Sequence, residues 1–471
     1  MIAGVLLFIV VPLVVAVVLY VVHRLQTLAA FIATGVAAVL GVGALWLPLD
    51  QVAMVGGRQV MLGAPVEVLG RQLVITGADR IVLAGLFLVA AGLFMIGWRA
   101  NPGASFFPLG LAILGLLSAA LVARPFLYAS LLLTITAVLA TIFLESGLSG
   151  KTRGALRFLV LMTLALPAFM VASWLLDLHT LNPTDTGLTR NIMLALTVGF
   201  VLLLGVVPFH IWIRPVVEES PPVAAVFVLT VFNSVTWFLL FDVLQEYPWL
   251  SSQQDMFRIL QFLGLLTAVV GGLLAFSSYD FVHVLSYGVL ADYGCGLIVL
   301  GMRTPAGLAA VMLATLARPV SLGVLALGLT LARQHVKSSQ FEKLAGMGWF
   351  YPWTAAALIV GGFSLAGIPP LTGFLGRWSE ARVLASAPSP YVLAVLGATL
   401  GVAAGTLRGL DYVFQPPSES AKALEHPREP RLMVALVVLS FIIVVGLGLF
   451  PGVVESALRS VVSCYTFFAA P

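Results

Sequence analysis

Ionisable side chains stand within, or at the edges of, several long apolar stretches of this sequence. A charged side chain inside a membrane is costly, so residues of this kind are by default candidates for binding or moving ions and protons. Histidine and aspartate can change protonation at such positions, whereas arginine holds a fixed charge. The six candidates are His210, Asp280, His283, Asp292, Arg318 and Arg377.

Asp292 and Arg318 form the most informative pair among these candidates. They have opposite charges and lie deep in two consecutive apolar stretches. A buried charge must find a partner, which predicts that the two side chains interact on neighbouring helices. A purely structural role is open for every candidate, and it is favoured for Asp280 and His283 because they lie where a stretch begins.

Proline and glycine interrupt two of the apolar stretches, and both interruptions adjoin candidate residues. They occupy residues 203–212 and 364–377. Helices are predicted to unwind locally near Gly205–Pro208 and Gly367–Gly373. Paired interruptions in two halves of a membrane protein point to an inverted-repeat transporter fold. Unwound backbone at membrane depth requires surrounding protein or a wet cavity.

Membrane-spanning helices are the elements that must position these residues. Of the 471 residues, 61% are hydrophobic and 9% are charged. Apolar segments of about 20 residues recur from end to end, and they predict an all-α polytopic membrane protein with about fourteen helices. The expected spans are 2–22, 26–47, 79–98, 105–123, 125–145, 156–177, 191–212, 222–242, 257–277, 281–302, 306–332, 352–383, 390–410 and 432–451.

The order of these spans predicts four regions. Residues 1–98 hold the first three helices, with a short extramembrane hairpin at 48–78. Residues 99–250 form the first repeat and 251–412 the second, with helices seven and twelve discontinuous. Residues 413–471 hold a polar loop and the last helix.

Basic loop residues predict the orientation of the chain. They are more frequent in loops that follow odd-numbered helices than in loops that follow even-numbered ones. By the positive-inside rule the odd loops are cytoplasmic, which places both termini on the periplasmic side of a cell inner membrane. The net charge of +4 then reports loop orientation in a lipid environment and does not indicate a nucleic-acid partner.

Motifs for hydrolytic or redox catalysis are absent from the sequence. There is no Gly-rich phosphate loop, no HExxH motif and no nucleophile elbow. An iron–sulfur cluster needs about four thiolates, and the chain has two distant cysteines, Cys295 and Cys464. The six histidines are scattered. We therefore expect no catalytic residue, no metal site and no cofactor bound by this chain.

The motifs around the breaks resemble the antiporter-like subunits of respiratory complex I and their relatives, the Mrp-type cation antiporters and membrane-bound hydrogenases. Residues 208–212 read Pro-Phe-His-Ile-Trp, against Pro-Phe-His-x-Trp in the family, and 280–289 are similar to its Asp-Leu-Lys-Arg segment. Residues 364–374, Ser-Leu-Ala-Gly-Ile-Pro-Pro-Leu-Thr-Gly-Phe, nearly repeat the family sequence. The resemblance covers about 100–430 and is nearest to the subunit N or subunit M type.

The same resemblance implies titratable residues that this chain lacks. In the family a glutamate on helix five pairs with a lysine on helix seven, and a second lysine follows on helix eight. Matching residues 123–124 to the family's helix-five entry places Thr134 at the glutamate. Leu203 stands at the first lysine, and Asn233 or Ser234 at the second. All three titratable groups of the first half are thus expected to be missing.

The second half keeps charges but changes their type. Asp292 stands where the family often has histidine, and Arg318 and Arg377 stand at lysine positions. Arginine stays protonated where lysine can titrate, so it relays protons poorly. The resemblance implies a non-catalytic, membrane-arm subunit of a complex I-like, NADH/quinone oxidoreductase-type assembly, with a proton pathway altered or lost in its first half. Quinone, flavin and Fe–S clusters are expected only in partner subunits.

Two other functions stay open. The chain is a scaffold or partner subunit of a multisubunit cation antiporter, a membrane hydrogenase or an inorganic-carbon uptake complex, which the neutral Thr134 and Leu203 favour. Alternatively it is a stand-alone secondary ion transporter, which the arginines beside broken helices suggest. Identifying co-purifying subunits would separate the complex I-like role from the scaffold role. Activity of the chain reconstituted alone would favour the stand-alone transporter.

Overall fold

A computed structural model describes residues 2–468 apart from 23, 48, 50–52, 56–57, 62, 69–70, 101, 146–151, 388 and 418–427. The chain divides into two compact units. Residues 1–205, 231–258 and 459–471 form the N-terminal unit, and residues 206–230 and 259–458 form the central unit. Residues 206–230 thus group with the later part of the chain, and the predicted boundaries of the sequence repeats stay a prediction.

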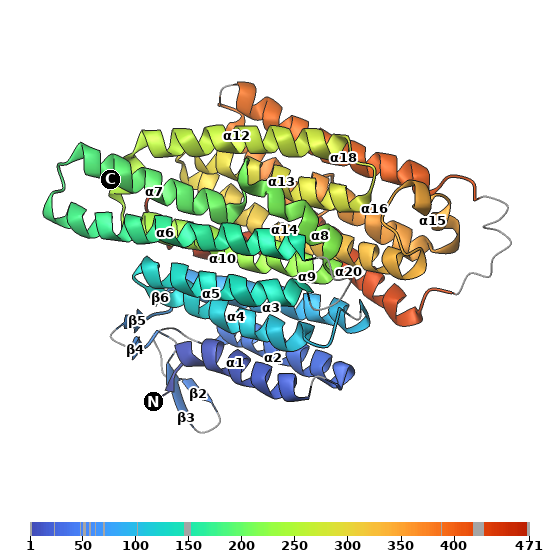
Figure 1. Cartoon of the computed structure of the whole chain (residues 1–471), viewed down its shortest axis with the longest axis horizontal. Helices are drawn as coiled ribbons and strands as arrows, with labels where there is room; N and C mark the ends of the chain where they lie inside the picture. The colour runs from blue at the N-terminus through green and yellow to red at the C-terminus, as the bar shows by residue number, and fades with distance from the viewer. Residues whose placement is uncertain are drawn as a thin grey trace. The chain divides into compact units, whose positions relative to one another are not determined.

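Helices, most of them long and apolar, build the N-terminal unit. They are α1 (Val5–Val21), α2 (Gln26–Trp46), α3 (Gly77–Ala100), α4 (Phe106–Val122), α5 (Phe126–Glu145), α6 (Arg153–Leu181), α7 (Thr186–Leu204), α10 (Asn233–Glu246) and α11 (Trp249–Ser252). α1 packs along α4, α2 along α3, and α6 along α7 (Figure 1). Apolar residues cover most of these helices on all sides, as expected for helices whose outer faces meet lipid.

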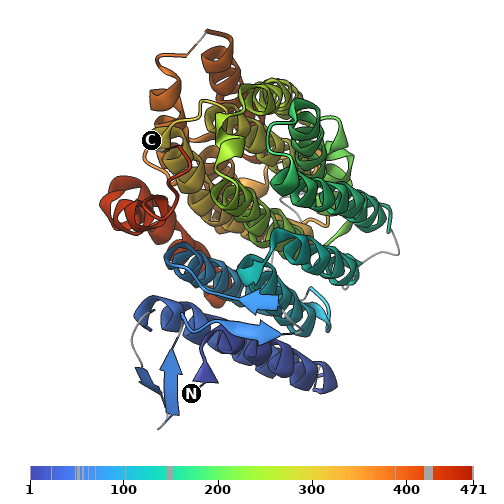
Figure 2. The same cartoon turned by 90° about the vertical axis from the view of Figure 1, so that its left-hand side faces the viewer.

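Six short strands lie at one end of these helices (Figure 1, Figure 2). β1 (Ile2–Ala3), β3 (Arg58–Met61) and β2 (Ala53–Val55) form one sheet, and β4 (Val66–Val68), β5 (Arg71–Leu73) and β6 (Ala123–Arg124) form the other. The predicted hairpin at 48–78 is therefore two antiparallel hairpins, each joined by a third strand. Gln72 pairs with Arg124, which fixes the backbone between α4 and α5.

Each of the other helices lies wholly or mostly in the central unit. They are η1 (Phe209–Trp212), α8 (Ile213–Glu219), α9 (Pro222–Phe227), the π-helix η2 (Val228–Phe232), α12 (Gln254–Phe276), α13 (Phe281–Leu300), α14 (Pro305–His335), η3 (Glu342–Leu344), α15 (Met347–Phe350), α16 (Pro352–Ala366), α17 (Gly373–Leu384), α18 (Ser389–Val413), α20 (Arg431–Leu449) and α21 (Gly452–Val462). α14 packs against α9, α13, α16 and α17. α14 therefore connects these four helices within the central unit.

The apolar helices confirm a multi-pass, all-α membrane protein. Among the described residues, eleven helical segments are long and apolar enough to cross a membrane, or twelve when the pair bent by 118° between α15 and α16 counts as one span. Two further apolar helices, α1 and α4, have 17 residues each and lie where two more spans are expected. The count of fourteen stays a prediction.

Both predicted helix breaks are confirmed. α7 ends at Leu204, Gly205 adopts a left-handed conformation with φ 65°, and the chain resumes as the 3-10 helix η1 and then α8. α16 ends at Ala366, Gly367 is left-handed with φ 82°, and helix resumes only at Gly373 in α17. A left-handed glycine is the usual end of a helix, since it needs no Cβ.

Replacing Gly367 by alanine tests the second break. The left-handed backbone costs an alanine about 1–2 kcal/mol. A Cβ at this position would also overlap Cγ of Arg377 and lie 2.9 Å from Cβ of Arg377. We expect Gly367→Ala to lower the free energy of unfolding, measured by denaturant titration in detergent, by at least about 1–2 kcal/mol.

Gly446→Ala is the matched control, because Gly446 lies inside α20 and nothing lies within 4 Å of an added Cβ. Alanine is favoured over glycine inside a helix by roughly 0.5–1 kcal/mol, so this variant should be at least as stable as the unchanged chain. Equal stability of the two variants would contradict a required left-handed break.

Candidate functional site: a buried charge network

Three helices of the central unit bring four charged side chains together beside the second break. α13 supplies Asp292, α14 supplies Arg318, and α17 supplies Arg377 and Glu380. The predicted pairing of Asp292 with Arg318 is confirmed. We call these four residues the charge network.

Asp292 is the centre of the charge network. Its Oδ2 accepts a hydrogen bond from Nε of Arg318 at 2.5 Å, and its Oδ1 lies 3.1 Å from Nη2 of Arg377. Nη1 of Arg377 donates to Oε2 of Glu380 at 3.0 Å. The exposed fraction of the side chain is 11% for Asp292, 2% for Arg318, 7% for Arg377 and 0% for Glu380. At this burial each charge depends on its partners, since water contributes little.

The charge network is electrically balanced. Two guanidinium groups face two carboxylates, and the guanidinium groups keep their protons. Protonating either carboxyl group would leave an excess positive charge in a buried site. Removing one ion-pair partner by mutation would do the same, and an uncompensated buried charge is strongly destabilising.

The second break shapes the space next to the charge network. The hydroxyl of Ser364, in the last turn of α16, lies 2.7 Å from that of Ser321 on α14 and accepts a bond from the Gly373 amide at 3.3 Å. Asp292, Arg318 and Arg377 line a small cavity with these three residues, with about 10 Å³ in which the centre of a water molecule fits. One water needs about that volume and two or more polar partners, and both are present here.

Tyr293 holds Arg318 from the other side. The guanidinium carbon of Arg318 lies 4.7 Å from the centre of the Tyr293 ring, within the range of a cation–π contact. The hydroxyl of Tyr293 donates to the carbonyl of Leu229 at 2.7 Å, and Leu229 belongs to the π-helix η2. π-helical turns free backbone carbonyls and often mark functional sites. The tyrosine thus connects Arg318 to the irregular turn that precedes α10 in the sequence.

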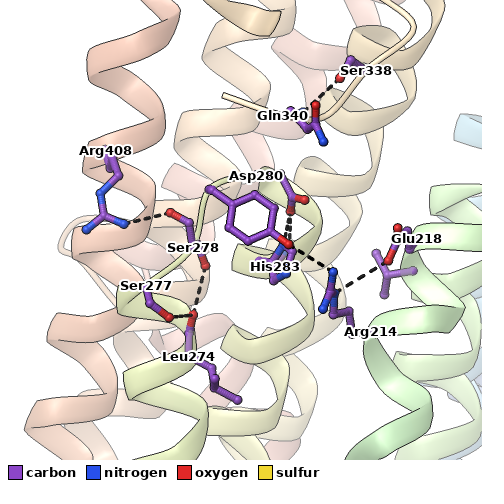
Figure 3. Close-up of polar contacts among 12 residues, drawn as sticks. Arg214, Glu218, Leu274, Ser277, Ser278, Asp280, His283, Ser338, Gln340 and Arg408 are labelled. Carbon is purple, nitrogen blue, oxygen red and sulfur yellow. Dashed lines mark hydrogen bonds and ion pairs between the residues drawn. The ribbon is translucent and has the colours of Figure 1, made fainter. Parts of the chain in front are cut away.

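Asp280 and His283 form a separate polar group at the start of α13 (Figure 3). Oδ1 of Asp280 caps the helix by accepting from the His283 amide at 2.6 Å, and it lies 2.6 Å from Nδ1 of the same histidine. Arg214 on α8 lies nearby and pairs with Glu218 at 3.7 Å (Figure 3). His283 precedes Asp292 by nine residues, about 14 Å along the helix, so the two do not form one site.

Arg333, near the end of α14, holds the segment that follows the first break. Its Nη1 donates to the carbonyl of Ser220 and its Nη2 to that of Val217, each at 3.0 Å. These carbonyls belong to the end of α8, where a cation satisfies unpaired acceptors and complements the helix dipole. α14 therefore positions both Arg318 and the backbone beyond His210.

His210 lies half-buried in η1. Among the described residues, no ion pair or hydrogen bond joins it to the charge network. The structure thus brings Asp292, Arg318 and Arg377 together and leaves His210 and His283 elsewhere.

The positions predicted to lack charge are neutral groups in the N-terminal unit. The hydroxyl of Thr134 donates to the Ser130 carbonyl of its own helix at 2.9 Å. Leu203 is buried in the last turn of α7, and Asn233 and Ser234 are buried at the start of α10. None of these side chains carries a titratable proton at neutral pH.

Glu380 is the member of the charge network that the sequence analysis missed. It is fully buried, and its Oε1 has no hydrogen-bond partner among the described residues. The available signal was its spacing: Glu380 follows Arg377 by three residues, and residues three apart share one face of a helix. An acidic residue at that spacing from a buried arginine is the expected counter-charge.

The charge network can hold fixed charges beside a water-sized cavity, and its two carboxylates are the groups within it that can bind a proton. Among the described residues, no three His, Cys, Asp or Glu side chains group together as a metal site requires.

Asp292→Asn tests the charge network directly. The amide keeps the shape of the side chain but leaves two buried guanidinium groups with one carboxylate. We expect the free energy of unfolding to fall by roughly 3–5 kcal/mol, as when one partner is removed from a buried pair. Asp255→Asn, on the exposed first turn of α12, is the control and should change little.

The double variant Asp292→Asn/Arg318→Gln separates charge from packing. It leaves Arg377 paired with Glu380 and restores electrical balance. We expect it to be more stable than Asp292→Asn alone, a coupling that a double-mutant cycle measures. If the stability lost by the double variant equals the sum of the losses of Asp292→Asn and Arg318→Gln, the ion pair contributes packing only.

Part of this chain is similar in sequence to known proteins. Residues 186–403 match the family described as NADH:quinone oxidoreductase/Mrp antiporter, TM. NADH-quinone oxidoreductase subunit N of Chromohalobacter salexigens is 32% identical over 226 residues, which is 46% of this chain and 45% of that protein. The Deinococcus radiodurans subunit N is 28% identical over 278 residues, 58% of this chain and 56% of that protein. The chain thus spans about half the length of these relatives.

Solved structures share the fold over nearly the whole chain. A chain of the membrane-bound sulfane sulfur reductase, an archaeal respiratory membrane complex, superposes with a TM-score of 0.81 at 16% identity, covering 99% of both chains. A chain of the Mrp complex from Dietzia gives 0.80 at 15% identity, covering 99% of this chain and 97% of that one. A chain of respiratory complex I from Thermus thermophilus gives 0.75 at 19%, covering 98% and 100%. The chain therefore shares the fold of these membrane-complex chains, and its residues 186–403 are similar to the NADH:quinone oxidoreductase/Mrp antiporter transmembrane family.

Proposed function

We propose that this chain is a membrane-arm, antiporter-like subunit of a complex I-like energy-coupling assembly, and that the proton pathway of its first half is altered or lost. The observation that carries the proposal is the asymmetry between the two units. The central unit holds four buried charges at a broken helix, whereas Thr134, Leu203 and Asn233 in the N-terminal unit are neutral. Relatives named NADH-quinone oxidoreductase subunit N support the kind of assembly.

The partners follow from the same proposal. Other membrane subunits would flank this chain in a cell inner membrane, with both termini on the periplasmic side. Electron transfer would belong to partner subunits that hold flavin, iron–sulfur clusters and quinone. The charge network of this chain would provide a fixed array of charges and would not itself carry protons.

A scaffold role in another multisubunit membrane complex is the second candidate. The neutral Thr134 and Leu203 favour it, because a proton relay needs groups that change protonation. Such a subunit would keep the antiporter fold for assembly and would conduct no ion itself.

Affinity purification from the native membrane in mild detergent separates these functions. The proposal expects quinone-site and hydrogenase-like subunits in stoichiometric amounts with this chain. Recovery of cation-antiporter subunits without them would favour the scaffold role. Ion transport by the chain reconstituted alone would identify an independent transporter and overturn both.

We predict that removing the central ion pair leaves proton pumping by the assembly intact. The variant Asp292→Asn/Arg318→Gln keeps the remaining charges paired, so assembly should survive. Protons moved per electron pair, measured in proteoliposomes, should equal those of the unchanged assembly. A lower ratio in an intact, electron-transferring assembly would mean that this subunit conducts protons.

The resemblance implies that Thr134 and Leu203 stand where the family has an ion pair. The free energy of unfolding of variants at these positions tests this correspondence. Leu203→Lys alone buries an unpaired charge and should cost roughly 3–5 kcal/mol. If the two positions face each other as the resemblance implies, adding Thr134→Glu should recover part of that loss. Ile135→Glu, one residue away on α5 and exposed, is the matched control that should recover nothing. Equal recovery by both would reject the correspondence.

A further inference from the structure

The N-terminal unit contains a second buried charge cluster, which the proposed function does not use. Arg124, between α4 and α5, lies between two carboxylates: its Nη1 is 3.2 Å from Oδ2 of Asp242 on α10, and its Nη2 is 3.7 Å from Oδ2 of Asp79 on α3. Asp79 is 0% exposed and Asp242 is 8% exposed. The hydroxyl of Tyr465 donates to the other oxygen of Asp242 at 2.9 Å.

Local structure fixes each member of this cluster. Arg124 belongs to β6, which pairs with β5. Asp79 accepts bonds at its Oδ2 from the amide and hydroxyl of Thr76, at 2.9 and 2.8 Å. Tyr465 follows α21 and packs against Phe241, with ring centres 6.0 Å apart. Burial raises the pKa of Tyr465 well above its ordinary value, so its hydroxyl stays a donor.

The charges of this cluster do not balance. One guanidinium faces two carboxylates, whereas the charge network of the central unit has two of each. Oδ1 of Asp79 is also buried without a hydrogen-bond partner among the described residues. A buried charge without compensation is normally removed by binding or losing a proton. Two carboxylates that share one site resist simultaneous ionisation for the same reason.

Neighbouring charges do not correct the imbalance. Glu246, one turn further along α10, also acts on Arg124 and adds negative charge, although water screens its exposed side chain. Arg80 follows Asp79 in the sequence, but its Nη1 donates to the carbonyl of Leu47 at 3.4 Å. The excess of one negative charge therefore stays with Asp79 and Asp242.

We propose that Asp79, Arg124 and Asp242 form a proton-binding site, in which one of the two carboxyl groups holds one exchangeable proton. A hydronium ion transfers its proton to a carboxylate oxygen and leaves as water, and the cluster becomes neutral. Arg124 has 27% of its side chain exposed, which gives water access for exchange. The site lies where α3 begins and α4 and α10 end, the side that the loop charges predict to be periplasmic. The proposed proton-binding site does not depend on which assembly contains the chain.

Infrared spectroscopy of the full-length chain in lipid, in light and heavy water, tests the proposal. The unchanged chain should show the carbonyl band of one protonated carboxyl group that shifts on deuterium exchange. Asp79→Asn and Asp242→Asn each leave one carboxylate paired with Arg124, so each should abolish that band. Asp255→Asn, on the exposed first turn of α12, is the control in which the same band should persist.

Three results would overturn the site: no such band in the unchanged chain, a band that survives either asparagine substitution, or loss of the band when sodium replaces potassium. Loss of the band in sodium would show that the site binds a cation instead of a proton. Tyr465→Phe keeps both acids and tests the site even where an asparagine variant does not fold. It removes a hydrogen bond to the ionised Asp242, so the band should persist to higher pH than in the unchanged chain. An unaltered titration would contradict the contact on which the site rests.

Discussion

A charge buried in a membrane protein must be balanced by a fixed partner, and the central unit is organised around that requirement. Asp292 lies between Arg318 and Arg377, and Glu380 completes the balance. Three helices must meet for these contacts to form, and α17 reaches its place only because the preceding helix ends at the left-handed Gly367. The break and the charges thus require each other: unwound backbone needs polar surroundings, and the charges need a gap in the apolar packing.

The two charge clusters of this chain differ in balance, and that difference assigns them different roles. The net charge of two arginines and two acids is zero while every group is ionised. The charge network therefore serves as a fixed array of charges. One arginine with two acids is neutral only when a proton is bound. Thr134 and Leu203 of the N-terminal unit are neutral, whereas Asp79 and Asp242 provide carboxyl groups there that can accept a proton.

Local patterns predicted much of the fold and part of the site. Proline and glycine at 203–212 and 364–377 predicted both breaks, because these residues act on the backbone where they stand. Opposite charges deep in adjacent spans predicted the Asp292–Arg318 pair. The cluster of the N-terminal unit could not be predicted in this way, since Arg124 and Asp242 are 118 residues apart and each alone looks like a loop or helix-end charge. Asp280, in contrast, is explained by its place at the start of α13 as a helix cap.

Tyr293 shows how a change at the charge network would reach beyond it. Its ring packs on the Arg318 guanidinium while its hydroxyl holds the Leu229 carbonyl in η2. A movement of Arg318 must therefore disturb either the cation–π contact or a hydrogen bond that satisfies an irregular turn. Both losses are costly in a buried site. An arginine held by Asp292 on one side and Tyr293 on the other is fixed in position, which suits a residue that provides a fixed charge better than one that carries protons.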